Sequence, residues 1–215
     1  YAPSEGKKFI SVTWPGFTGV VSGMNESGLT VTINAAKSSI PFGAATPVSL
    51  VAREILQYAS TISEAVAIAS KRKMFVSESF LIASAQDHKA VIIEKTPSTL
   101  DVYESGQNEL ICTNHYQSQS LGDSKLNQEQ KQNSASVYRY ERLNELLTSV
   151  HINSPSQTAA ILRDYRGKGN QDIGLGNEKA LNQFIAHHSI IFEPERLLAW
   201  VSTSPWQEGE YRCYD

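Results

Sequence analysis

Apolar and polar positions alternate in short runs along the first part of the chain, and this alternation predicts strands. Residues 9–13 and 17–22 are rich in β-branched and aromatic side chains, which favour strands. Residues 26–28 predict a hairpin turn, because they place polar residues before a glycine. The run 29–34 alternates apolar with polar side chains, so we expect a half-buried strand with Asn34 on its polar face.

Helical spacing replaces this alternation from residue 48 onward. Apolar residues recur at helical intervals over residues 48–59 and again over residues 64–70, which predicts two adjacent helices. Pro47 is expected as the first helical residue, where its missing N–H is not needed. Four further apolar runs predict successive antiparallel strands, at residues 80–85, 90–94, 100–104 and 110–113.

The remaining chain predicts helices followed by a final hairpin. Residues 118–133 are polar and indicate either a mobile loop or the approach to a helix. Residues 135–150 and 156–163 have helical spacing. Two short strands, 189–192 and 197–202, are predicted to form the last hairpin.

The order of these elements predicts the fold class. Strands come first, then a helix pair, four strands, helices and strands again, which indicates α+β rather than alternating βαβ units. Two mainly antiparallel sheets packed together with helices outside would satisfy this order. The sequence contains no internal repeat, and we expect residues 1–215 to form a single domain.

Composition excludes several classes of function. The net charge is -3, so a basic footprint for nucleic acid is not expected, and no apolar run reaches membrane-spanning length. Cys112 and Cys213 do not make a disulfide framework, and no Cys or His pair has metal-ligand spacing. We therefore expect neither a metal nor a cofactor. A soluble protein is expected, and the compartment stays open between cytoplasm and periplasm or secretion.

Two asparagines at the ends of predicted strands are candidates for chemistry. Asn34 ends the run 29–34, and Asn114 follows the apolar run 110–113. An asparagine at such a position can direct an amide N–H toward the negative oxygen that forms when a carbonyl is attacked. Trp14 and Phe17 could supply an apolar wall for an acyl group.

The cysteines and histidines give weaker candidates. Cys112 and His115 are separated by an odd number of positions, so in an extended strand they point to opposite faces and make a poor catalytic pair. Cys213 is expected on a terminal tail, without the rigid surroundings that activate a nucleophile. His187 and His188 are expected as a polar entry to a strand.

Three segments resemble one enzyme family. They are Gly23-Met24-Asn25-Glu26-Ser27-Gly28-Leu29, Thr113-Asn114-His115 and Trp14-Pro15-Gly16-Phe17. Together they resemble the choloylglycine hydrolase and acyl-CoA:6-aminopenicillanate acyltransferase (peptidase C45) branch of the N-terminal nucleophile hydrolases. The resemblance implies an αββα sandwich, incomplete at its N-terminal side. It also implies hydrolysis or acyl transfer at linear amide C–N bonds.

The resemblance implies roles for individual residues. Asn34 and Asn114 would stabilise the oxyanion, and Arg139 would order the pocket of the nucleophile. Arg142 competes with Arg139, because the spacing from the preceding serines differs from that in the choloylglycine hydrolases. Trp14, Phe17 and His115 are expected to contact the substrate, a small-molecule amide or acyl compound.

The family's nucleophile is a cysteine at a processed N-terminus, which attacks the amide and forms a thioester. This chain begins with Tyr1. We therefore expect a companion segment or chain, released by autoprocessing, to carry the cysteine, or the sequence to be a fragment. The alternative is a non-catalytic relative that binds a small ligand in the same pocket. Assembly into a homo-oligomer stays open.

Overall fold

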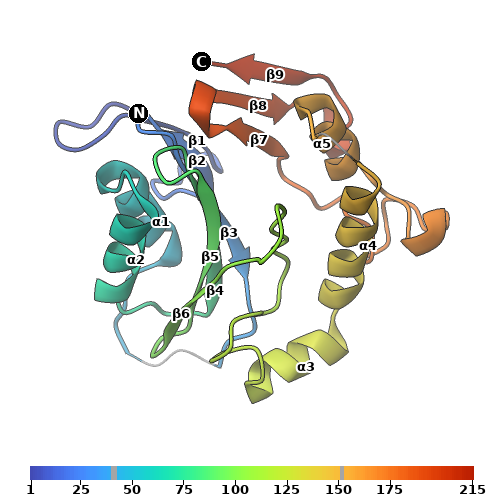
Figure 1. Cartoon of the computed structure of the whole chain (residues 1–215), viewed down its shortest axis with the longest axis horizontal. Coiled ribbons are helices and arrows are strands. Elements are labelled where there is room, and N and C mark those ends of the chain that lie inside the picture. The colour runs from blue at the N-terminus through green and yellow to red at the C-terminus, as the bar shows by residue number, and fades with distance from the viewer. Residues whose placement is uncertain (40–42, 151–152) are drawn as a thin grey trace.

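The computed structural model describes residues 1–39, 43–150 and 153–215. Two antiparallel sheets lie between two layers of helices (Figure 1). Helices α1 (Val48–Tyr58) and α2 (Ile62–Lys71) cover the outer face of the larger sheet. Helices α4 (Ser136–Thr148) and α5 (Pro155–Leu162) lie on the other side of the molecule, where α5 packs against the smaller sheet. This arrangement confirms the predicted α+β class and the αββα sandwich.

The larger sheet is an antiparallel meander in which each strand pairs with the next along the chain. Its strands are β1 (Phe9–Val12), β2 (Ser22–Asn25), β3 (Leu29–Ala35), β4 (Glu78–Ser84), β5 (Lys89–Lys95) and β6 (Leu100–Tyr103). The smaller sheet has the order β7 (Ile190–Glu193), β8 (Leu198–Ser202) and β9 (Tyr211–Tyr214). Helix α3 (Lys125–Asn133) precedes α4, and three short 3₁₀ helices are η1 (Lys168–Asn170), η2 (Pro194–Arg196) and η3 (Pro205–Gln207).

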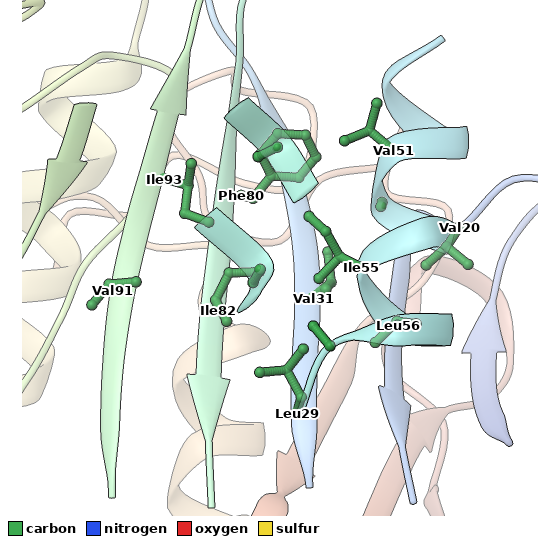
Figure 2. Packing of buried hydrophobic residues seen from close by; sticks show 14 of the residues in the cluster. Val20, Leu29, Val31, Val51, Ile55, Leu56, Phe80, Ile82, Val91 and Ile93 are labelled. Atoms are coloured by element: carbon green, nitrogen blue, oxygen red, sulfur yellow. The ribbon is translucent and has the colours of Figure 1, made fainter. Parts of the chain in front are cut away.

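The main core lies between the larger sheet and α1 (Figure 2). Alternate residues of β3, β4 and β5 point toward α1 and the neighbouring α2, because side chains alternate between the two faces of a strand. The fully buried members include Leu29, Val31, Phe80, Ile82, Ile93, Val51, Ile55 and Leu56. Each such side chain contributes roughly 1.5–3 kcal/mol when removed from water, so this layer supplies much of the hydrophobic stabilisation.

Most of the predicted elements are present. The alternating run 29–34 forms β3, and both helices predicted before residue 71 form. Pro47 is the residue before α1 rather than its first helical residue. The last hairpin forms from β7 and β8, joined by η2.

The strand predicted at residues 17–22 is wrong, because β2 begins only at Ser22. The backbone here bonds to the start of α1 instead: Val20 N donates to Ser49 O at 2.9 Å. Gly19 permits this approach, since an added Cβ would lie 2.4 Å from Ser49 Oγ. A local preference for extended structure was therefore overruled by contact with a helix.

The strand predicted at residues 110–113 is also wrong, because no ladder forms there. Side chains, rather than a neighbouring strand, provide hydrogen-bond partners for its backbone. Gln117 Nε2 donates to Ile111 O at 2.8 Å, and Asn114 N donates to Ser136 Oγ at 2.8 Å. Asn114 therefore follows an irregular segment that is fixed to α4.

The second half of the polar stretch 118–133 forms helix α3, whereas the sequence predicted only a mobile loop or the approach to a later helix. Buried Asn127 anchors this helix. Its amide donates to Tyr116 O and Gly122 O, and its oxygen accepts from Tyr116 N at 2.7 Å. The terminal tail expected around Cys213 is instead strand β9, in which Cys213 pairs with Trp200.

Asn25, at the end of β2, ties the β2–β3 turn to the end of α1. Its side-chain nitrogen donates to Leu56 O at 2.8 Å and to Ala59 O at 2.7 Å. Its side-chain oxygen accepts from Ser27 N at 3.0 Å and from Leu29 N at 3.1 Å. Since the side chain is buried, no water replaces these four partners if the amide is lost.

Across the described ranges, none of the helices is long and apolar enough to cross a membrane.

Asn25→Ala is expected to lower the free energy of unfolding by about 2–4 kcal/mol, because it leaves buried backbone donors and acceptors without partners. Urea denaturation followed by circular dichroism measures the change. Asn108→Ala, at an exposed position, is the matched control and should be close to neutral. A loss no larger than that of the control would contradict the structural role of Asn25.

Candidate functional site

A cavity of about 740 Å³ lies where the segment before β2, the end of β3, helix α4 and the segment before β7 meet. One part of its wall is apolar and another is polar. The apolar residues are Trp14, Val21, Ile33, Leu181 and Ile185, and the ionisable or amide-bearing residues are Glu78, Asn114, Arg139, Glu178, Gln183, His187 and His188. The volume and mixed lining suit a small organic ligand.

The side chain of Asn114 is held in one orientation at this cavity. Its Oδ1 accepts from Arg139 Nη2 at 2.7 Å, and its Nδ2 donates to Ala35 O at 2.8 Å. A guanidinium can only donate, so the amide oxygen must face Arg139. One N–H is used by Ala35, and the second is available to a ligand. Sequence order alone could not have predicted this fixed orientation.

Arg139 links three parts of the structure from its position on α4. Besides Asn114, it contacts Glu178, whose backbone oxygen accepts from Arg139 Nη1 at 2.6 Å. Burial lowers the pKa of Arg139, and the carboxylate of Glu178 partly opposes this. The guanidinium nevertheless stays charged at any physiological pH. The structure thus brings Arg139 and Asn114 together at the cavity.

His115, next to Asn114 in the chain, does not line the cavity. Its Nδ1 contacts Ser136 Oγ at 2.8 Å and Thr113 Oγ1 at 3.1 Å, and the ring is buried. Burial, followed by the charges of Lys131 and Arg139, lowers the pKa of His115 to about 4. The ring is therefore neutral near pH 7 and holds the backbone that carries Asn114.

Of the remaining predicted residues, only Trp14 lines the cavity. Phe17 packs edge-on against Trp14, with ring centroids 5.2 Å apart, and therefore supports the wall from outside. Asn34 is half-buried in β3 between Ile33 and Ala35, both of which line the cavity. The Asn34 side chain lies on the face opposite the Ile33 side chain, which packs against the core next to α1. Asn34 is not among the residues that line the cavity.

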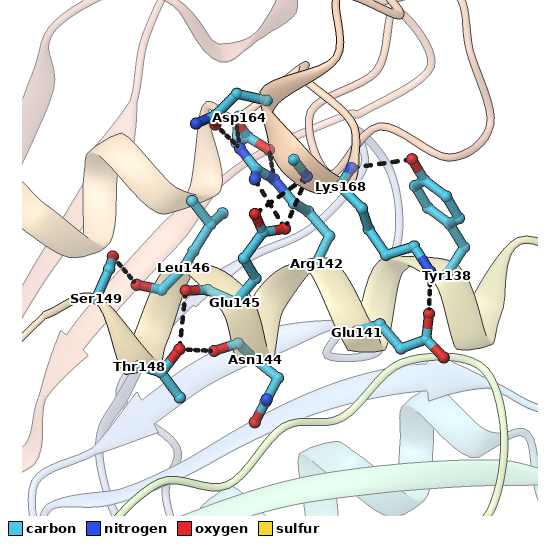
Figure 3. Close-up of polar contacts among 12 residues, drawn as sticks. Tyr138, Glu141, Arg142, Asn144, Glu145, Leu146, Thr148, Ser149, Asp164 and Lys168 are labelled. Atoms are coloured by element: carbon cyan, nitrogen blue, oxygen red, sulfur yellow. Dashed lines mark hydrogen bonds and ion pairs between the residues drawn. The ribbon is translucent and has the colours of Figure 1, made fainter.

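Arg142, the competitor of Arg139, is not part of the cavity. It is 1% exposed and bonds Asp164 through Nε at 2.8 Å and through Nη2 at 3.0 Å. Nη2 also donates to Asn170 Oδ1 at 2.8 Å. Nη1 lies 3.0 Å from Glu145 Oε2, and Figure 3 shows Arg142 between Glu145 and Asp164. These contacts fasten the segment after α5 to α4, so Arg142 is a structural residue.

His187 and His188 line the cavity, although the sequence indicated only a polar entry to β7. His188 Nε2 lies 3.0 Å from Ser22 Oγ, and burial and the neighbouring His187 lower the pKa of His188. The His187 ring packs edge-on against Trp14 at 5.8 Å. The adjacent histidines were the only signal in the sequence. The residues that they contact, Ser22 and Trp14, lie more than a hundred positions away along the chain.

Glu78, at the start of β4, is a functional candidate that no pattern in the sequence indicated. Only 8% of the residue is exposed, and its Oε2 has no hydrogen-bond partner among the described residues. Burial raises the pKa of this carboxyl to about 7. Lys95 is its cross-strand neighbour, but no ion pair joins the two within the described chain.

Neither cysteine lies at the cavity. Burial, reinforced by the charges of Glu94 and Glu78, raises the pKa of the Cys112 thiol to about 12. Such a thiol is almost entirely protonated at neutral pH and is a poor nucleophile. Cys213 is exposed on β9, away from the cavity residues. In the part of the chain that the structure describes, no three His, Cys, Asp or Glu residues gather as metal ligands.

One protein family matches most of the chain. The family model described as acyl-coenzyme A:6-aminopenicillanic acid acyl-transferase matches residues 1–202. An uncharacterized protein of Archaeoglobus fulgidus is 30% identical over 86 residues, which are 39% of this chain and 14% of that protein.

Three solved structures share the fold. Penicillin V acylase from Agrobacterium tumefaciens has a TM-score of 0.55 at 14% identity, covering 87% of this chain and 64% of its own. A variant of conjugated bile acid hydrolase from Clostridium perfringens has a TM-score of 0.57 at 11% identity. The match covers 97% of this chain and 81% of the hydrolase chain. The Caenorhabditis elegans ortholog of N-acylethanolamine-hydrolyzing acid amidase has a TM-score of 0.50 at 15% identity. The match covers 92% of this chain and 80% of the amidase chain. The chain thus spans less than two thirds of the penicillin V acylase.

Glu78→Gln is expected to stabilise the protein more at pH 8 than at pH 5. Below the unfolded pKa of about 4.5, the carboxyl is protonated in both states, whereas above about 7 the folded protein buries a charge. Removing that charge should therefore raise the free energy of unfolding by about 2.5 kcal/mol more at pH 8 than at pH 5.

Urea denaturation at the two pH values measures this difference. The matched control is Glu208→Gln, at an exposed position. Its effect on stability should hardly change with pH. Equal stability changes for Glu78→Gln at both pH values would contradict the raised pKa.

Proposed function

The chain belongs to the acyl-coenzyme A:6-aminopenicillanic acid acyl-transferase family, and we propose that it forms the larger part of an enzyme that acts on linear amides. The enzyme would hydrolyse the C–N bond or transfer the acyl group to an amine. The observation that carries this proposal is the fixed amide of Asn114 at the cavity, with one N–H available. The fold shared with amide hydrolases supports it.

In the proposed reaction, a cysteine thiolate attacks the substrate carbonyl carbon. The electrons of the C=O bond move to oxygen, and Asn114 donates a hydrogen bond to the resulting oxyanion. Collapse of this intermediate breaks the C–N bond, and the leaving nitrogen takes the proton that the thiol gave to the α-amino group of the same cysteine. A neutral amine is released and a thioester remains. Water or a second amine then attacks the thioester and regenerates the thiol.

The chain's own residues have separate roles in this scheme. Arg139 is a positioning residue, because it reaches the reacting atoms only through Asn114. Trp14 and the apolar wall of the cavity would bind the acyl group. Asn34 and Phe17 do not line the cavity, so the scheme gives them no step.

The nucleophile is proposed to lie on a companion segment with an N-terminal cysteine. The protonated state of Cys112 and the position of Cys213 argue against either as the nucleophile. The edge strands β1, β7 and β9 offer backbone groups with which a further strand could pair. The same facts would also suit a relative that binds ligands without catalysis, which is the second candidate.

Asn114→Ala in the active preparation is expected to lower kcat by about 10²–10³-fold, because one oxyanion donor is lost. Suitable substrates are penicillin V, a conjugated bile acid and an N-acylethanolamine, which are the compounds named for the relatives. The matched control is Asn133→Ala, at the exposed last residue of α3. An unchanged kcat would remove Asn114 from the mechanism.

A cysteine-directed electrophile that mimics an acyl donor is expected to label an N-terminal cysteine outside these residues. Brief exposure of the native preparation, followed by intact mass and peptide mapping, locates the label. The raised pKa of Cys112 protects it, and Cys213→Ser should leave the labelling rate unchanged. Rapid labelling of Cys112 with loss of activity would overturn the proposed mechanism. A native preparation without a third cysteine would favour the ligand-binding relative.

A further inference from the structure

Two buried glutamates at the same end of the larger sheet differ in the hydrogen-bond partners that the chain supplies to their carboxyl groups. Glu94 in β5 is fully buried, and its carboxylate accepts from Gln117 N at 2.6 Å and from Ser118 N at 3.0 Å. Glu78 in β4 is 8% exposed, and no hydrogen bond to its carboxyl comes from the described residues. A buried carboxyl without partners is costly, so such a group points to a partner supplied from elsewhere.

The position of Glu78 indicates where that partner lies. Glu78 is one of the residues that line the 740 Å³ cavity. It pairs across the sheet with Ala35, and the oxygen of Ala35 accepts from Asn114. Directly paired residues of antiparallel strands lie about 4.5–5.5 Å apart at Cα, so Glu78 and the Asn114 amide share one end of the cavity.

The charges around the cavity leave the Glu78 carboxyl without compensation. The guanidinium of Arg139 is directed to Asn114 and to the backbone of Glu178. Lys95 forms no ion pair with Glu78 in the described part of the chain. A ligand that carries a positive, N–H-donating group would supply both the charge and the hydrogen bonds that the chain does not.

We propose that Glu78 binds the ammonium group of a primary amine whose apolar part lies against Trp14, Val21 and Ile33. The carboxyl accepts the N–H groups of the amine, and the apolar wall removes its hydrocarbon part from water. A carboxylate ligand of the same size is disfavoured at this end, because it would place a second negative charge beside Glu78.

This inference rests on the proposed function in one respect. If the enzyme cleaves amides, the ammonium corresponds to the amine half, because Glu78 lies beside the proposed oxyanion donor Asn114. The binding of an amine requires no nucleophile, however. A direct binding measurement therefore tests Glu78 independently of catalysis.

The experiment compares hexylammonium, 1-hexanol and hexanoate, which share one hydrocarbon chain and differ in the head group. Affinities are measured at pH 7.5 by chemical-shift titration of the isotope-labelled native protein. Hexylammonium should bind most tightly of the three. Glu78→Gln should lower the affinity for hexylammonium by about tenfold or more. It should change the affinity for 1-hexanol by less than about twofold.

Two variants locate the interaction. Glu178→Gln is the matched control, because Glu178 lines the same cavity but is exposed, and it should leave the hexylammonium affinity unchanged. Trp14→Ala should weaken hexylammonium and 1-hexanol alike. Equal affinities of Glu78→Gln and the unaltered protein for hexylammonium would overturn the proposal, as would a loss confined to Glu178→Gln. Amine binding without amidase activity would leave it standing while refuting the proposed function.

Discussion

The structure depends on the way one buried amide joins the larger sheet to its covering helix. Asn25 bonds the last carbonyls of α1 and the backbone of the β2–β3 turn at the same time. Because all four partners are main-chain groups, the relative position of helix and turn is fixed independently of the core side chains. The strand that follows, β3, therefore leaves this turn in a defined direction and delivers Ala35 to the cavity.

The cavity inherits its geometry from that strand. Ala35 receives the bond from Asn114, and its cross-strand neighbour is Glu78, so two polar groups meet at one strand end. Helix α4 supplies Arg139 from the opposite side, and Arg142 fixes the same helix to the segment after α5. Directed polar contacts of this kind give the site a single arrangement, whereas the apolar core alone would fix only the packing of its layers.

The sequence predicted elements whose partners are local and failed where the partners are distant. Strand β3, helix α1 and the β7–β8 hairpin follow from periodicity and turn residues within a few positions. Residues 17–22 and 110–113 have the composition of strands, yet their backbones bond to Ser49 and to the side chains of Gln117 and Ser136. The Gly-Met-Asn segment was informative for the family, but the structural role of its asparagine was visible only in three dimensions. Glu78 had no signal in its neighbours, because the cavity that it lines is assembled from segments far apart in the chain.

Arg139 also shows why one side-chain shape is required on α4. Its two terminal nitrogens reach different acceptors, the amide of Asn114 and the backbone of Glu178. A lysine has one nitrogen at the end of a flexible stem and could hold both acceptors only if they converged on a single point. The planar guanidinium therefore holds its two acceptors at a fixed distance from each other, in addition to carrying a charge. It fixes the separation between the segment that carries Asn114 and the backbone at Glu178, both of which line the cavity.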